Sequence, residues 1–178
     1  MTAKLKRGIT KVKDPGSALT HFIAMILAII AAIPLLSKAG HDSGHMRISA
    51  LAIFILSMIG LYAASTIYHT LDISPKINKL LRKIDHMMIY ILIAGTYTPV
   101  CMIVLGDKTG WTMLTLVWGI AIVGILINAL WITCPKWFSS LIYIAMGWVC
   151  ILAITKILSS MPRAGFMWLL AGGIIYTA

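Results

Sequence analysis

The residues best suited to chemistry in this chain are serine, histidine and aspartate side chains at the ends of apolar runs. Ser65 and His69 lie four residues apart near the end of one run, and Asp85 opens the next. Ser17 and His21 repeat the same spacing early in the first run. A spacing of four puts each pair on one helix face. Ionisable residues within or beside a lipid-spanning segment are energetically costly, and they normally mark a functional site.

Two histidines and a carboxylate at one membrane depth are the ingredients of a zinc site, with the aspartate as a ligand or as the partner of a ligand. A catalytic zinc keeps one position open for water and lowers the pKa of that water towards 7. A structural interpretation stays open as well. A histidine at a helix end can sit among headgroups, and Asp85 follows Arg82 and Lys83 and can be an interfacial ion-pair partner. His86 lies about 100° around the helix from Asp85, so we expect it to face elsewhere.

The composition predicts the kind of protein that positions these residues. The chain is 60% hydrophobic and 11% charged, with a mean hydropathy of +0.95. A soluble domain of this size cannot bury that much apolar surface. All but the last apolar run approach the roughly 20 residues that a helix needs to cross a bilayer. We predict an all-α, polytopic transmembrane helical bundle in one domain, 1–178, with a basic arm over 1–16. The predicted helices cover residues 17–36, 46–69, 85–105, 111–133, 137–155 and 164–178.

The sixth apolar run continues to Ala178. A membrane helix that stops within such a run leaves its terminal carbonyls without partners in an apolar medium. We therefore expect the natural chain to continue beyond residue 178, the alternative being a short re-entrant or tilted last helix.

The distribution of basic residues predicts the orientation of the bundle. The net charge is +10, and the lysines and arginines fall in the loops and the arm. One side has ten of them: Lys4, Lys6, Arg7, Lys11, Lys13, Lys76, Lys79, Arg82, Lys83 and Lys136. The other side has five: Lys38, Arg47, Lys108, Lys156 and Arg163. The excess marks the cytoplasmic side, so we predict an N-terminus inside the cell and both Ser–His pairs and Asp85 in the cytoplasmic leaflet. Topology and anionic headgroups account for the charge, and we expect no nucleic-acid partner.

Three motifs carry a family resemblance: S-T-I-Y-H at 65–69, L-R-K-I-D-H at 81–86 and A-G-T-Y-T-P at 94–99. Together they resemble the haemolysin III proteins of bacteria. These belong to the wider progestin and adipoQ receptor family and are distantly similar to alkaline ceramidases. The resemblance covers essentially the whole chain. It implies seven transmembrane helices, of which six are visible here, a multi-pass location in the bacterial inner membrane, and a zinc ion near the cytoplasmic leaflet.

The resemblance also assigns roles to residues. His69 would be a zinc ligand, Ser65 would lie close to the zinc, and Asp85 would hold or deprotonate the zinc-bound water. In the family the other two ligands come from an H-x3-H motif in the seventh helix. This sequence has no such motif in its C-terminal helices, and its H-x3-H at 41–45 lies in the first loop on the opposite side. We therefore expect those ligands beyond residue 178; otherwise the protein does not hold zinc in the family's way.

The first helix departs from the family pattern. Members tend to show E-x2-N-x3-H there, whereas this sequence has Asp14, Ser17 and His21. The carboxylate is one carbon shorter and the amide is replaced by a hydroxyl. We expect His21 to be a supporting polar residue rather than a zinc ligand.

Three functions remain in competition. The first is a zinc-dependent intramembrane hydrolase of a lipid amide or ester, with Asp85 and Ser65 as catalytic residues. The second is a cytolysin or pore former, as the family name implies, although the helices lack the repeated polar stripe expected for conduction. The third is a receptor or stress-response protein without catalysis. Membrane lipids are the expected partners, and the sequence predicts neither the substrate nor the oligomeric state.

Overall fold

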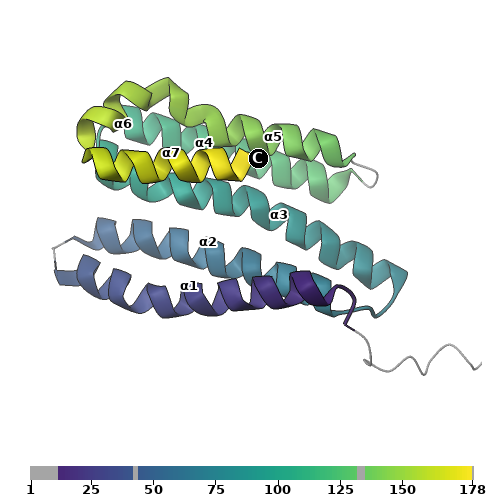
Figure 1. Cartoon of the computed structure of the whole chain (residues 1–178). Coiled ribbons are helices and arrows are strands. Elements are labelled where there is room, and N and C mark those ends of the chain that lie inside the picture. Colours follow the sequence, from purple (N-terminus) through teal and green to yellow (C-terminus); the bar gives the residue numbers. More distant parts are fainter. Residues whose placement is uncertain (1–11, 42–43, 132–134, 178) are drawn as a thin grey trace, which may run out of the picture.

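The computed structural model describes residues 12–41, 44–131 and 135–177, and all of its secondary structure is helical (Figure 1). The elements are α1 (Pro15–His41), α2 (His45–Thr70), α3 (Pro75–Pro99), the π-helix η1 (Val100–Leu105), α4 (Lys108–Leu130), α5 (Lys136–Trp148), the 3-10 helix η2 (Val149–Ala153), α6 (Ile154–Ser160) and α7 (Arg163–Thr177). Within the described residues, five helical stretches are long and apolar enough to cross a membrane. The predicted all-α membrane bundle is confirmed.

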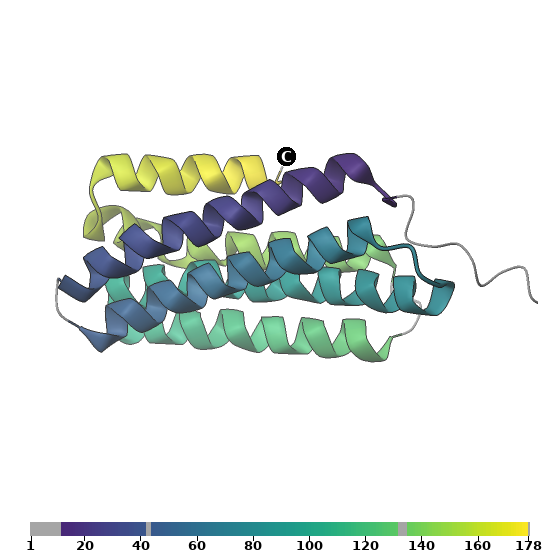
Figure 2. The same ribbon diagram turned by 90° about the horizontal axis from the view of Figure 1, so that it is seen from below.

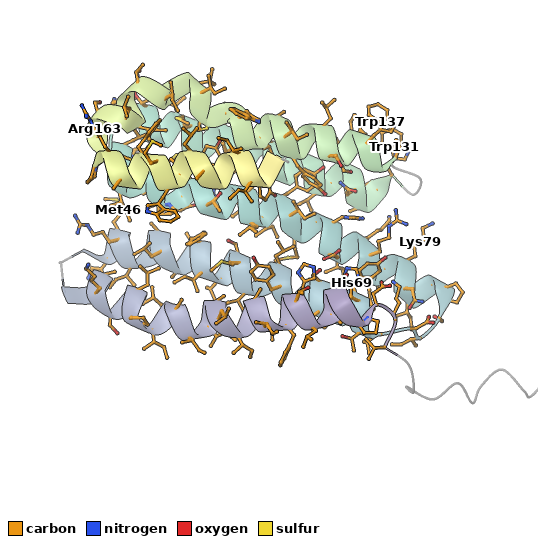
Figure 3. The ribbon with its side chains drawn as sticks, in the orientation of Figure 1. Met46, His69, Lys79, Trp131, Trp137 and Arg163 are labelled. Carbon is orange, nitrogen blue, oxygen red and sulfur yellow. The ribbon has the colours of Figure 1, made fainter. Side chains whose placement is uncertain are left out.

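Consecutive long helices run antiparallel and pack side by side (Figures 1 and 2). α3 lies in the middle, between α2 on one side and α4 and α5 on the other. We call the end of the bundle where α1 and α3 begin and α2 ends the basic end. His69, Lys79, Trp131 and Trp137 lie at this end, whereas Met46 and Arg163 lie at the opposite end (Figure 3).

The core is centred on α3 and the helices that cover it. Its fully buried members include Tyr90, Ala94, Val117, Met146 and Ile157. Many large apolar side chains elsewhere face outward, among them Leu27 and Ile33 on α1. Such a surface requires an apolar solvent, so the outer helix faces contact membrane lipids.

The third helix begins ten residues earlier than the predicted start at residue 85. Ser74 caps it by accepting a hydrogen bond from the Ile77 N–H at 3.3 Å, and Pro75 occupies the first turn. Both are favoured at helix starts, because the serine satisfies a free N–H and proline has none to satisfy. Residues 75–84, which lie outside the predicted helices, are therefore continuous with the membrane helix. Asp85 lies three turns inside α3, not at its start.

Two of the long helices change from α-helical to another helical hydrogen-bonding pattern, and the two changes lie close together. α3 passes into η1, and the predicted helix 137–155 is interrupted by η2 before it continues to Ser160. The Tyr97 hydroxyl contacts the backbone groups at this interruption. It lies 2.9 and 2.7 Å from the carbonyl oxygens of Met146 and Gly147, and it accepts a hydrogen bond from the Cys150 N–H at 2.9 Å. Irregular backbone is tolerated at membrane depth only where protein groups satisfy it in this way.

At the opposite end, Asp107 joins α4 to α6. Its carboxylate caps α4 by accepting from the N–H groups of Thr109 and Gly110, and it pairs with the Lys156 ammonium. The Lys156 hydrogen bond, followed by the bond from the Gly110 N–H, holds the pKa of Asp107 below its ordinary value. The pair is therefore intact at neutral pH and is lost only as the pH falls through this lowered pKa.

We predict that Gly110→Ala destabilises the protein, whereas Gly119→Ala in the same helix does not. A Cβ atom at Gly110 would overlap the carbonyl oxygen of Cys101, a backbone atom that cannot rotate away, while nothing lies within 4 Å of one at Gly119. The expected cost at Gly110 is about 1–3 kcal/mol. Thermal unfolding in detergent measures it. Equal melting temperatures for the two variants would contradict the close contact of α4 with η1.

Candidate functional site

His69 lies one residue before the end of α2, and Asp14 binds its ring. The Asp14 carboxylate oxygen Oδ2 is 3.0 Å from Nδ1 of His69. The backbone fixes the pair, because the Asp14 N–H donates to the His69 carbonyl at 2.9 Å and the Lys13 N–H to that of Thr70 at 3.4 Å. The segment that precedes α1 is thus tied to the end of α2. With Nδ1 engaged, Nε2 is the nitrogen of His69 left for another partner.

His21 lies beside His69, so the histidines of the two Ser–His pairs meet. The rings are nearly parallel, with centroids 5.7 Å apart and an interplanar angle of 13°. The Tyr68 ring packs edge-on against His69 at 4.8 Å, and His21 also contacts the Tyr62 ring. The His69 imidazole is therefore held by neighbouring rings as well as by Asp14.

The register of α2 against α3 places Asp85 close to the level of Ser65. A Cβ atom at Gly95 would overlap Ser57 and lie 3.6 Å from the Ile53 carbonyl, so Gly95 packs at the level of residues 53–57. Asp85 comes ten residues before Gly95 in α3. Because α2 runs antiparallel to α3, Asp85 lies at the level of the α2 residues that come ten positions after 53–57, namely residues 63–67. Ser65 and Asp85 are both buried, at 4% and 8% exposure. They lie about one turn deeper in the bundle than His69.

Comparison with known proteins places this architecture in a family. A sequence model for proteins described as Haemolysin-III related matches residues 9–178. The chain belongs to the haemolysin-III-related family. It is 40% identical over 178 residues to Hemolysin-3 of Bacillus cereus, covering 99% of this chain and 81% of that protein. It is 37% identical over 165 residues to the Hemolysin-3 homolog of Bacillus subtilis (strain 168), covering 93% of this chain and 77% of that protein.

This haemolysin-III-related protein is therefore a multi-pass membrane protein, as its five long apolar helices and its family both indicate. The resemblance inferred from the motifs at 65–69, 81–86 and 94–99 is confirmed. The named relatives are bacterial proteins. Location in the bacterial inner membrane stays a prediction.

The haemolysin-III-related bundle also contains a buried polar network that the sequence analysis missed. The Asn128 amide donates to the Tyr90 hydroxyl at 3.1 Å and to the Ser139 hydroxyl at 3.2 Å, which joins α3, α4 and α5. Tyr143 packs edge-on against Tyr90 and donates to the His86 carbonyl at 2.8 Å. The sequence did contain one signal for this network, the lone asparagine Asn128 within an apolar run. An amide at membrane depth requires a hydrogen-bond partner in the bundle.

This network reaches the candidate site. Tyr143 of α5 lies within electrostatic range of the Asp85 carboxylate. The Tyr90 ring fills the space above Gly124, where a Cβ atom would overlap it. Asp85 therefore lies at the level of Ser65 on α2 and within electrostatic range of Tyr143 on α5.

The described residues of this haemolysin-III-related chain fit part of a zinc site. His69 has the arrangement typical of a zinc-binding histidine, with one ring nitrogen on a carboxylate and the other left for the metal. Catalytic zinc normally has three protein ligands. Within the part of the chain that the structure describes, no group of three His, Cys, Asp or Glu side chains could hold a metal. The geometry therefore fits one histidine ligand, with Asp85 and Ser65 a turn deeper, and not a complete centre.

Proposed function

We propose that this haemolysin-III-related protein is a zinc-dependent intramembrane hydrolase that acts on a lipid amide or ester. The observation that supports it best is the Asp14–His69 contact at 3.0 Å, because it orients the imidazole with Nε2 left for a metal. The burial of Asp85 and Ser65, at a level about one turn further into the bundle, supports them as the acid–base group and the hydroxyl of the same site. Costly polar groups at membrane depth are expected where a site needs them.

Each side chain has a separate role in this proposal. Bound zinc would supply a Lewis acid that polarises the scissile carbonyl and activates water. His69 would hold the metal through Nε2, and the Asp14 carboxylate would keep the ring in the tautomer that leaves Nε2 unprotonated. Asp85 accepts the proton of the attacking water as general base and returns it, as general acid, to the departing nitrogen or oxygen when the acyl bond breaks. The Ser65 hydroxyl donates a hydrogen bond that orients the water or the developing oxyanion.

An apolar cavity supports a lipid as the substrate. It has a volume of about 410 Å³ and is lined by side chains from α2, α3, η1, α5, η2, α6 and α7, including Met58, Thr96 and Trp148. Tyr176 also lines it and lies within electrostatic range of Tyr62, three residues before Ser65. One part of the cavity therefore approaches the candidate site. An acyl chain in this cavity would bring its amide or ester group towards Ser65 and Asp85.

Asp14→Asn is expected to weaken zinc binding by about 10–100-fold, the usual effect of removing the carboxylate partner of a ligating histidine. The control is Asp72→Asn at the same end. Asp72 accepts a hydrogen bond from Asn78 at 2.7 Å and does not contact His69. Competition with a chromophoric zinc chelator gives the affinity. Equal affinities for the two variants would show that the Asp14–His69 contact does not serve the metal.

The names of the two relatives favour a second candidate, a cytolytic protein that permeabilises membranes. One experiment on the reconstituted protein distinguishes the two. Fatty acid release from a panel of lipid amides and esters is measured beside leakage of a dye from the same vesicles. A hydrolase cleaves at least one member and leaves the vesicles sealed, whereas a cytolysin releases dye without cleavage. Leakage without any cleavage would reject the hydrolase.

A further inference from the structure

The first turns of α3 extend past the hydrocarbon core at the basic end. Pro75–Leu105 is one helical stretch of 31 residues, which is about 46 Å at 1.5 Å per residue. A hydrocarbon core is about 30 Å thick. α3 also reaches beyond the ends of α4 and α5 at this end (Figures 1 and 2). We call residues 75–83 the α3 projection.

One hydrogen bond and two tryptophans mark where the α3 projection leaves the apolar region. The Lys83 ammonium donates to the Ala129 carbonyl at 3.0 Å, near the end of α4. The exposed Trp131 and Trp137 lie just beyond it, at the end of α4 and the start of α5 (Figure 3). Tryptophan gathers at the boundary between lipid tails and headgroups. Residues 75–82 therefore lie at headgroup level or outside it.

The α3 projection separates its side chains into two exposed faces. At 100° per residue, its four basic side chains share an arc of about 120°. Ile77 and Leu80, together with Ile84 one residue beyond the projection, share an adjacent arc of about 60°. The basic residues are Lys76, Lys79, Arg82 and Lys83. The three apolar side chains are 38%, 55% and 37% exposed. A basic face beside an exposed apolar face is the pattern of helices that bind at a lipid interface.

Three cations of the α3 projection have no anionic partner among the described residues. Among the described residues, no carboxylate lies within 4 Å of the charged nitrogens of Lys76, Lys79 or Arg82. The nearby acids are used elsewhere: Asp14 binds His69 and Asp72 binds Asn78. Three cations in seven residues that no described carboxylate neutralises create a positive potential, which attracts anionic groups.

We propose that the α3 projection is a docking surface for the headgroups of anionic phospholipids in the leaflet at the basic end. Lys76, Lys79 and Arg82 contact the phosphates, while Ile77 and Leu80 enter the boundary between headgroups and tails. A membrane is favoured over an acidic protein because the cations and the exposed apolar arc lie together at the depth marked by the tryptophans. The surface is separate from the site at His69 and does not depend on the proposed hydrolysis.

The test measures the association of spin-labelled phosphatidylglycerol, relative to spin-labelled phosphatidylcholine, with the protein in phosphatidylcholine bilayers. The triple variant K76Q/K79Q/R82Q should lose most of the preference for phosphatidylglycerol, with a fall of up to roughly five-fold for each cation removed. The matched control, K38Q/K108Q/R163Q, removes three exposed cations from the opposite end and should retain it. A third variant, K76R/K79R/R82K, keeps the charges and should also retain it, which separates loss of charge from loss of folding.

Added salt should reduce the preference of the wild-type protein, because the headgroup contacts are exposed to ions. Equal losses in the two glutamine variants would show a diffuse charge effect and reject a site on the α3 projection. An unchanged preference in K76Q/K79Q/R82Q would reject it as well. If a soluble acidic peptide binds the wild type and removes the preference at equimolar amounts, the surface belongs to a protein partner and not to lipid.

Discussion

Replacing Asp85 with asparagine is expected to reduce lipid hydrolysis by about 10²–10⁴-fold, the range for loss of a general base. The amide keeps the shape of the carboxylate but does not accept the proton of the attacking water. Zinc should stay largely in place, with at most a 10–100-fold loss of affinity. Release of fatty acid in bilayers gives the rate, and metal analysis of the same preparation gives the zinc content.

Ser65→Ala is the matched comparison for Asp85→Asn, because Ser65 is buried at nearly the same level. Its effect should be milder, since a hydroxyl that orients water or an oxyanion does not carry the proton. If wild type and Asp85→Asn have equal activity in every assay, Asp85 is only a buried polar group. Loss of activity with complete loss of zinc would instead make Asp85 a ligand.

His69→Ala is expected to remove zinc from the purified protein, because His69 is the only described side chain arranged as a metal ligand by both its spacing and its partner. The fall in affinity should exceed the 10–100-fold expected for Asp14→Asn, since a ligand is lost and not the partner of a ligand. His45→Ala serves as the control, because His45 is exposed at the opposite end. Equal zinc in His69→Ala and His45→Ala would remove His69 from the ligand set.

The helical bundle was predictable because membrane helices are set by length and hydropathy. The predicted starts of the second and fifth helices fall within two residues of His45 and Lys136. The start of α3 was missed because its first turns contain four basic residues, which lower the hydropathy below that of a membrane run. Ser74–Pro75 was nevertheless a readable start signal, since both residues are favoured at helix starts.

Part of the candidate site was also readable from the sequence. The spacing of four put Ser65 and His69 on one face, and the first-helix pattern singled out Asp14 and His21. The Asp14–His69 contact was not predictable from spacing, because it joins residues 55 positions apart and depends on backbone bonds before α1. The depth of Asp85 was misjudged for the same reason as the start of α3.

The polar network around Asn128 depended on tertiary packing alone. Its partners come from α3 and α5, and it forms because Gly124 leaves room for the Tyr90 ring. No local pattern specifies which helices meet at an asparagine, so the sequence indicates that it needs a partner but not which one.

The zinc dependence of hydrolysis tests the central claim most directly. The protein is stripped of metal with a chelator, reconstituted in bilayers with a lipid amide or ester that it cleaves, and titrated with zinc. Turnover is expected to rise in proportion to bound zinc and to level off at about one zinc per chain, the stoichiometry of a single catalytic site. Turnover that survives stripping, or that zinc does not restore while the protein stays folded, would contradict the proposed zinc-dependent site at His69.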